Sequence, residues 1–136
     1  MNRVQGRILG IEASEGVSLV DVETGGGIIS SVILETPESS EYLRLDAEVC
    51  VLFKETEVAL GLDAGKMSYL NVFDGKVLSM RCGRVLAEVV VWTAAGEIVS
   101  VITKRSFERL GLKEGARVKA IIKATEVALE GLGASS

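Results

Sequence analysis

Histidine is absent from this chain of 136 residues, and aromatic side chains make up only 4% of it. The lack of histidine removes the commonest general base and the commonest metal ligand at neutral pH. Few aromatic rings are available to stack on bases, and the net charge of -4 opposes phosphate binding. The composition therefore argues against acid-base catalysis and against DNA or RNA as a partner.

Long apolar runs are also missing. The longest, such as residues 89–92, fall far short of the ~20 residues that cross a bilayer, and the N-terminal residues lack the apolar core of a signal peptide. We therefore expect a cytoplasmic protein with no membrane span. Cys50 and Cys82 fit that compartment: they could pair, but two lone cysteines in a cytosolic chain are more often reduced.

What the chain does contain is a tandem repeat. Residue n aligns with residue n+69 without a gap, from Asn2 and Asn71 to Leu60 and Leu129. The closing block Thr-Glu-Val-Ala-Leu of the first repeat returns whole at the end of the second. The sequence thus records a duplication of one module.

Two domains are therefore predicted, residues 1–62 and residues 69–132, with a linker at about residues 61–68. A module of this size buries only about 60% of its unfolded surface, so it is marginal alone and tends to pack against neighbours. We expect the chain to form an oligomer.

The second repeat has the clearer pattern of secondary structure. Gly96 predicts a hairpin turn, because glycine supplies positive φ. A short helix is predicted at residues 104–110, closed by Gly111 in the left-handed conformation. Segments rich in valine, leucine and isoleucine predict strands at residues 75–82, 85–92, 97–103, 117–123 and 126–129.

The first repeat predicts the same elements, including a helix, because Thr36 places a capping hydroxyl before Pro37 in a first helical turn. Five short strands with one small helix are typical of a partly closed barrel. The predicted fold is all-β with short helices, built as two tandem OB-like small barrels.

Groups for covalent chemistry cannot be assembled from this sequence. Serine and cysteine have no histidine to activate them, and neither a phosphate-binding glycine loop nor a spaced cysteine cluster is present. We predict that the protein is not an enzyme and has no catalytic residue, no metal ligand and no organic cofactor.

Hydroxyl and ammonium groups lie at the ends of predicted elements in the second repeat. Thr103 precedes the predicted helix, and Lys123-Ala124-Thr125 follows a predicted strand. A threonine hydroxyl and N–H groups near a helix start can bind an oxyanion, and lysine adds a compensating charge. Alternatively, Thr103 is only a helix cap and Lys123 a solvated strand end.

At these residues the second repeat resembles the molybdenum-binding Mop domains, also called TOBE domains, of bacterial molybdate-handling proteins. The resemblance rests on segments in the family's order: residues 71–73, 75–77, 87–89, 101–103, 110–115 and 122–127. The tandem arrangement resembles small di-Mop proteins, which bind molybdate or tungstate in the cytoplasm and assemble as trimers. The resemblance implies capture of a small oxyanion at domain or subunit interfaces.

Carried over by position, the resemblance implies ligands in three stretches of the second repeat: Ser68, Asn71, Thr103, Lys123, Ala124 and Thr125, with Ala124 acting through its backbone. Leu70 stands where the family has an arginine, which removes an expected positive contact.

The first repeat departs further from the family. Leu34 occupies the threonine position, and Glu55 follows Lys54 where the family has alanine. An acidic side chain there repels an oxyanion. Lys54 and Thr56 remain as a weaker candidate site.

Charge separates the two repeats in the same direction. Residues 1–65 carry four Lys/Arg against twelve Asp/Glu, a net charge of -8, and residues 66–136 carry eleven against seven, a net charge of +4. Because summed surface charge raises or lowers the local concentration of anions, the second repeat is the better setting for an oxyanion.

Two functions follow as hypotheses. The leading one is a cytoplasmic homo-oligomer, a trimer by resemblance, that stores, buffers or delivers molybdate or tungstate. The alternative is a degenerate accessory module, related to the regulatory domains of transporter ATPases or regulators, that makes protein contacts and has weak or lost anion binding. The missing arginine and the diverged first repeat favour the alternative, whereas the retained Thr103 and Lys123 favour the first.

Overall fold

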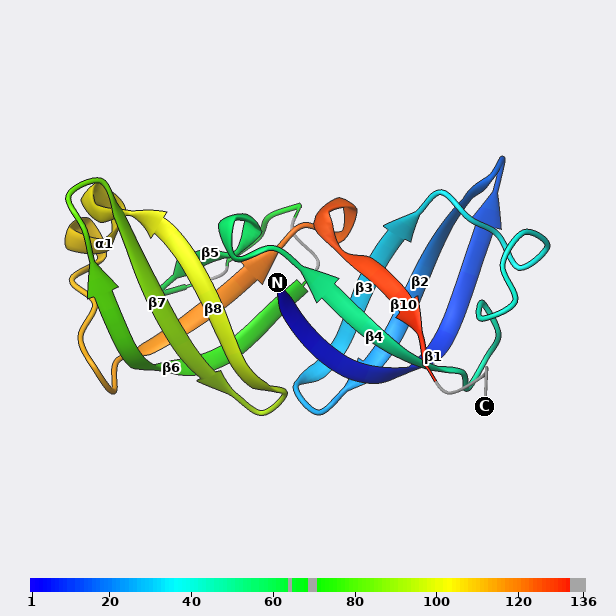
Figure 1. Cartoon of the computed structure of the whole chain (residues 1–136), viewed down its shortest axis with the longest axis horizontal. Helices are drawn as coiled ribbons and strands as arrows, with labels where there is room; N and C mark the ends of the chain where they lie inside the picture. Colours follow the sequence, from blue (N-terminus) through cyan, green and yellow to red (C-terminus); the bar gives the residue numbers. More distant parts are fainter. Residues whose placement is uncertain (64, 69–70, 133–136) are drawn as a thin grey trace.

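Two curled antiparallel sheets lie side by side along the long axis of the molecule (Figure 1). The computed structural model describes residues 1–63, 65–68 and 71–132. The first sheet contains β1 (Asn2–Ser14), β2 (Val17–Thr24), β3 (Gly27–Ile33) and β4 (Glu48–Phe53), and the second contains β6 (Asn71–Cys82), β7 (Leu86–Thr93), β8 (Gly96–Thr103) and β9 (Arg117–Ile122). The predicted all-β class with two tandem OB-like barrels is confirmed. None of the helices in the described part is long and apolar enough to cross a membrane.

The long first strand of each sheet bends so that it can pair on both sides. In β1 the register shifts between Ile8 and Gly10, and in β6 it shifts at the matching position. Such a bulge increases local twist and curls the sheet. Gly75 makes the curl possible, since a Cβ on it would lie 2.5 Å from the carbonyl oxygen of Trp92.

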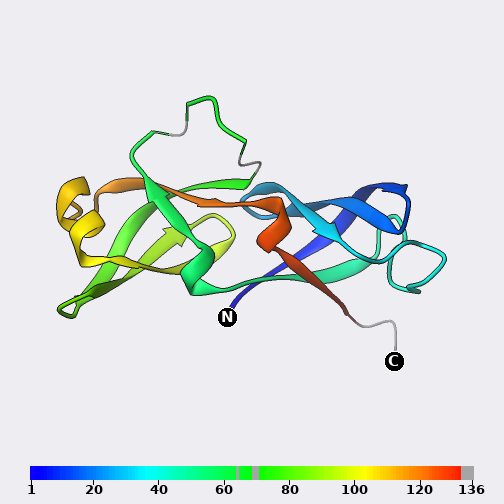
Figure 2. The same cartoon turned by 90° about the horizontal axis from the view of Figure 1, so that it is seen from above.

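The last strand of each repeat is exchanged between the two sheets. β10 (Ala128–Gly131), at the end of the second repeat, pairs with β4, and β5 (Ala59–Gly61), at the end of the first repeat, pairs with β9. Figure 2 follows the two crossings, in which β4 continues toward β5 and β9 continues toward β10. The strand near residues 126–129 was expected in its own barrel, and this part of the prediction is wrong because the strand completes the opposite sheet.

Two short 3-10 helices carry the chain across. The first, η1 (Glu55–Glu57), packs against β8, and the second, η2 (Ala124–Glu126), packs against β3. A buried serine fixes each crossing: Ser100 Oγ donates to the Val58 carbonyl at 2.7 Å, and Ser31 Oγ donates to the Val127 carbonyl at 2.6 Å. Since residues 31 and 58 match residues 100 and 127 in the repeat, the two crossings are equivalent.

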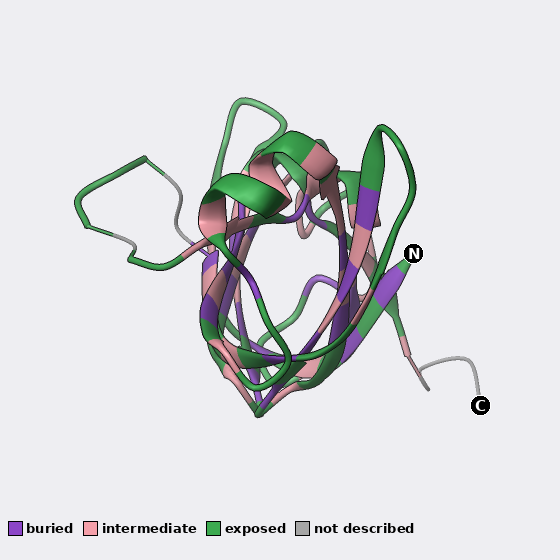
Figure 3. Ribbon diagram, turned by 90° about the vertical axis from the view of Figure 1, so that its left-hand side faces the viewer, coloured by how far each residue is buried: buried purple, intermediate pink, exposed green. Residues whose placement is uncertain are grey.

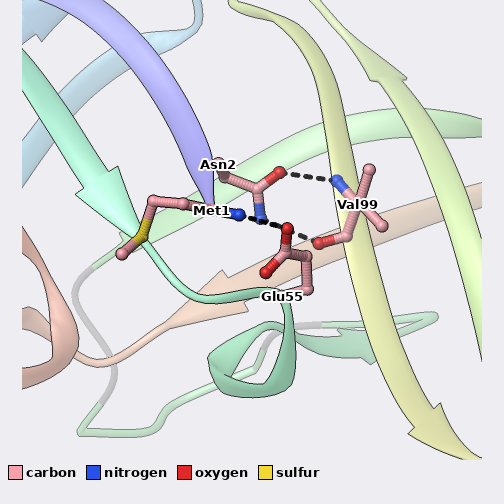
Figure 4. A network of polar contacts seen from close by, with 4 residues as sticks. All are labelled: Met1, Asn2, Glu55 and Val99. Carbon is pink, nitrogen blue, oxygen red and sulfur yellow. Dashed lines mark hydrogen bonds and ion pairs between the residues drawn. The ribbon is translucent and has the colours of Figure 1, made fainter.

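Two buried asparagines join the sheets to each other. The Asn2 side chain donates to the Val99 carbonyl and accepts from the Val99 N–H, both at 2.8 Å (Figure 4). Asn71 makes the same pair of 2.8 Å bonds with Ser30, the residue that matches Val99. Each side-chain amide thus makes the two hydrogen bonds that the backbone of a paired strand would make with that residue. We call these two contacts the asparagine clamps.

The main hydrophobic core runs through both halves. It includes Val22 and Ile29 from the first sheet and Ile98 and Ile122 from the second. At its centre the rings of Phe53 and Phe73 stack with centroids 6.2 Å apart. Figure 3 looks along the molecule and shows buried segments on the inner side of the curled strands. The two repeats therefore share the main core, and a second, smaller cluster around Val89 and Val91 belongs to the second repeat.

The single α-helix, α1 (Lys104–Leu110), follows β8 as predicted and ends at Gly111, whose φ of 63° is left-handed. The expected helix in the first repeat is wrong, because turns occupy the corresponding segment. A single turn forms after Thr36, where the Ser40 N–H donates to the Thr36 carbonyl at 3.0 Å, but it does not continue into a helix.

The predicted hairpin turns are confirmed. Gly27 and Gly96 have φ of 113° and 112°, values that favour glycine. In each turn a threonine hydroxyl donates to the glycine carbonyl, Thr24 at 2.7 Å and Thr93 at 2.8 Å. Cys50 and Cys82 are both free.

The asparagine clamps generate a prediction about stability. We expect Asn71→Ala to lower the free energy of unfolding by about 2–4 kcal/mol, because it leaves a backbone N–H and a carbonyl of Ser30 without partners. Urea unfolding followed by circular dichroism measures the change. Arg3→Ala, at an exposed ion pair with Glu130, is the control and is expected to change stability by less than about 1 kcal/mol. A loss for Asn71→Ala no larger than that of the control would contradict the structural role of the clamp.

The strand exchange generates a second prediction. A fragment of residues 1–62 lacks β10 and carries β5 with no β9 to pair with, so we expect it to be either unfolded or associated with a second fragment through exchanged strands. Light scattering and circular dichroism over a range of concentrations distinguish these states. A folded monomeric fragment would show that residues 1–62 form an independent domain, as the repeat boundaries alone predict.

Candidate functional site

Thr103 and Lys123, both predicted ligands, line one surface hollow of about 480 Å³. The hollow lies where β8 ends and α1 begins, with η1 on another side. Its polar lining consists of Thr56, Glu57, Thr103, Ser106, Lys123 and Glu126. Hydroxyl groups and one ammonium group therefore meet at the junction of the two repeats.

The exchange of strands between the two sheets determines which residues line the hollow. Thr56 was predicted to form a separate, weaker site with Lys54, but the crossing at η1 carries it into the hollow with Thr103. Lys54 is exposed and is not among the lining residues. The hollow is thus built from both repeats, and it contains Thr56 without Lys54.

Thr103 is the N-cap of α1. Its Oγ1 accepts from the Ser106 N–H at 3.1 Å, and its hydroxyl lies 3.0 Å from Ser106 Oγ, to which it donates. This direction of donation leaves the Ser106 hydroxyl hydrogen free to reach a ligand in the hollow. Thr103 is therefore a helix cap that also lines the hollow, and Ser106 is a lining residue that the sequence interpretation missed.

Ala124 and Thr125 stand between lining residues but do not line the hollow themselves. Ser68 is exposed, after β5 and before β6. Asn71 is fully buried, and both ends of its amide are bonded to Ser30. The structure thus brings Thr103 and Lys123 together, whereas the Asn71 amide joins the two sheets. Leu70 lies outside the described residues.

The charge of the hollow is acidic on balance. Lys123 is its one lining cation among the described residues, and Glu57 and Glu126 are its carboxylates. A dianionic ligand in this hollow therefore requires a further positive charge. Leu86 also lines the hollow and is 52% exposed.

The matching place in the first repeat has lost these hydroxyl groups. Leu34 stands at the position of Thr103 and Pro37 at the position of Ser106. The Leu34 side chain is 83% exposed, so an apolar group faces solvent where the second repeat has a hydroxyl donor. The two ends of the molecule share their strands, but the first repeat lacks both the helix and the hydroxyl groups of the second.

A duplicated small barrel with exchanged strands and a polar hollow at the junction of its repeats defines a class of small binding proteins, and comparisons identify the family. Residues 67–129 match the TOBE domain. Molybdenum-pterin-binding proteins 1, 2 and 3 of Clostridium pasteurianum are 45%, 45% and 44% identical to the chain over 62 residues, which are 45% of this chain and 91% of each relative.

A solved structure matches the whole tandem arrangement. The cytoplasmic molybdate-binding protein ModG, with molybdate bound, superposes with a TM-score of 0.89 and 34% identity over 97% of this chain and 96% of that protein. The chain belongs to the Mop/TOBE family.

The capping role of Thr103 can be tested apart from any ligand. We expect Thr103→Ala to lower the free energy of unfolding by about 1 kcal/mol and Thr103→Ser to retain most of the stability, because serine can accept the same bond from Ser106. Urea unfolding measures both changes. Leu34→Ala is the matched control, since no helix follows Leu34. Equal stability of Thr103→Ala and the native chain would contradict the capping role of Thr103.

Proposed function

We propose that the chain binds molybdate or tungstate in the hollow beside Thr103 and acts as a cytoplasmic store, buffer or carrier of that oxyanion, without covalent chemistry. The most direct support for oxyanion binding is that Thr103, Ser106 and Lys123 line the same hollow. The relatives support it as well, since ModG is a cytoplasmic molybdate-binding protein and the clostridial relatives are molybdenum-pterin-binding proteins.

The chemistry of the lining suits a tetrahedral oxyanion. Molybdate accepts hydrogen bonds through four oxygens, and bonds from hydroxyl and ammonium groups to an ionised acceptor are stronger than bonds between neutral groups. Ser106 offers a free hydroxyl hydrogen and Lys123 offers three N–H donors. Ser68, Thr125 and the backbone of Ala124 remain predicted ligands from the family resemblance.

We propose that a second chain completes the site. Glu57 and Glu126 outweigh Lys123 within one chain, so the missing positive charge must come from outside the hollow. Val85 and Leu86 lie before and at the start of β7 and are 72% and 52% exposed, as expected of residues that a neighbouring chain covers. The proposed assembly is a homo-oligomer, with the trimer of the family as the expected form.

A specific observation favours a second role for the first repeat. Leu34 is an exposed apolar side chain where the second repeat has Thr103. This end of the molecule suits a protein contact better than an anion. We propose that it serves as an accessory interaction surface while anion binding belongs to the Thr103 hollow.

Anion binding can be measured directly by equilibrium dialysis of the native protein against molybdate, tungstate and sulfate. We expect molybdate and tungstate to bind more tightly than sulfate, because fixed donors discriminate by the size of the anion. Lys123→Ala is expected to weaken molybdate binding by about tenfold, since it removes a charge-assisted hydrogen bond. Lys54→Ala is the matched control and is expected to bind molybdate as the native chain does.

Two outcomes would contradict the proposal. If neither molybdate nor tungstate binds, or if Lys123→Ala and Lys54→Ala bind equally well, the hollow is not the anion site. Sedimentation velocity on the same samples tests the contribution of a second chain. A monomer that binds molybdate with full affinity would overturn the shared site and leave the Lys123 assignment to be decided by dialysis.

A further inference from the structure

A row of three exposed side chains crosses the outer face of the second sheet. In the register of the strands, Lys76 on β6 lies directly opposite Trp92 on β7 and directly opposite Arg117 on β9. Directly opposed residues have Cβ atoms about 4.5–5.5 Å apart on one face of the sheet. Lys76 is therefore an immediate neighbour of both the Trp92 indole and the Arg117 guanidinium, which lie on its two sides.

This arrangement is unfavourable in the absence of a ligand. Like charges directly opposite each other on a sheet are destabilising, and within the part of the chain that the structure describes neither Lys76 nor Arg117 forms an ion pair. Lys119 also belongs to this face, but its ammonium pairs with Asp74. Glu97 on β8 lies directly opposite Trp92 at the end of the row, whereas Lys76 and Arg117 lie opposite each other and neither has a carboxylate directly opposite it.

At the matching positions of the first repeat, the directly opposed residues carry charges of opposite sign. The matching row is Glu23, Arg7 and Glu48, in the same register, so one cation lies between two carboxylates. The second repeat has the same backbone positions with a tryptophan and an arginine in place of the two glutamates. The fold therefore does not require the positive pair.

A hollow accompanies the row. It has a volume of about 700 Å³ and is lined by Lys76, Trp92, Arg117 and Leu62, together with the pair of Asp74 and Lys119. The Trp92 side chain is 56% exposed. A hydrophobic ring that is open to solvent beside two unpaired cations combines a stacking surface with an anion-binding pair.

We propose that this hollow binds a planar aromatic ring that carries a phosphate group, as in a mononucleotide. The ring stacks on Trp92, and the phosphate lies between Lys76 and Arg117, where a guanidinium can donate two parallel hydrogen bonds. A long nucleic acid is disfavoured because the matching row of the first repeat carries Glu23 and Glu48. This site is separate from the hollow beside Thr103.

The chain itself supplies the reporter for the test, because Trp92 is its one tryptophan. The native protein is titrated with AMP, with adenosine and with inorganic phosphate, and binding is followed by tryptophan fluorescence and by calorimetry. We expect AMP to bind at least about tenfold more tightly than either of its parts, because only AMP uses both the indole and the cations. Equal binding of phosphate and AMP would overturn the aromatic part of the proposal.

Substitutions locate the site. Arg117→Glu restores the charge pattern of the first repeat and is expected to weaken AMP binding by tenfold or more. Trp92→Phe, followed by calorimetry, is expected to retain binding, and Trp92→Glu to lose it. Arg7→Ala is the matched control in the first repeat, and Lys123→Ala is the control for the other hollow, so both are expected to bind AMP as the native chain does.

The outcomes remain distinguishable from those of the molybdate experiment. No binding of AMP by the native protein, or equal binding by Arg117→Glu and Arg7→Ala, would overturn the proposal whatever molybdate does. Arg117 is exposed, so the variant is expected to fold, and circular dichroism verifies this. Loss of AMP binding in Lys123→Ala would also contradict it, because the two hollows would then be one coupled site.

Discussion

Exchange of the last strand between the two sheets is the constraint on which the rest of the structure depends. Neither β4 nor β9 obtains its outer partner from its own repeat, and the asparagine clamps and the shared core join the same two halves. A barrel of about sixty residues buries too little surface to be stable alone. Duplication within one chain solves this problem, since each copy supplies the strand and part of the core that the other lacks.

The same constraint decides where chemistry can occur. The crossing at η1 brings Thr56 and Glu57 from the first repeat to Thr103 of the second, so the hollow exists only because the strands are exchanged. The hollow also contains two carboxylates, those of Glu57 and Glu126, beside the ammonium group of Lys123. The large charge difference between the two repeats in the sequence therefore does not carry over directly to the hollow, and this is why we propose that a neighbouring chain supplies positive charge.

Much of the fold could be predicted from the sequence because local signals determined it. Glycines at the hairpins, the cap at Gly111 and the segments rich in valine, leucine and isoleucine predicted the correct elements of the second repeat. The partner of each final strand could not be predicted, because the Thr-Glu-Val-Ala-Leu block is identical in the two repeats. The same limit applies to the site: Ser106 becomes a lining residue only through α1, and Asn71 has its amide occupied across the interface.

Comparison of the repeats within the chain separates positions that the fold requires from positions that are free to change. The clamp asparagines, the crossing serines and the hairpin glycines are the same in both repeats, because each serves the exchange. Residues that face outward differ: Leu34 matches Thr103, and Glu23 matches Trp92. The backbone is equivalent at Glu23 and Trp92, so sheet formation cannot account for that difference, whereas Thr103 caps α1 and no helix follows Leu34. Ligand binding is the explanation that we propose for Trp92, and the hollow beside Thr103 combines residues of the second repeat with Thr56 and Glu57 of the first.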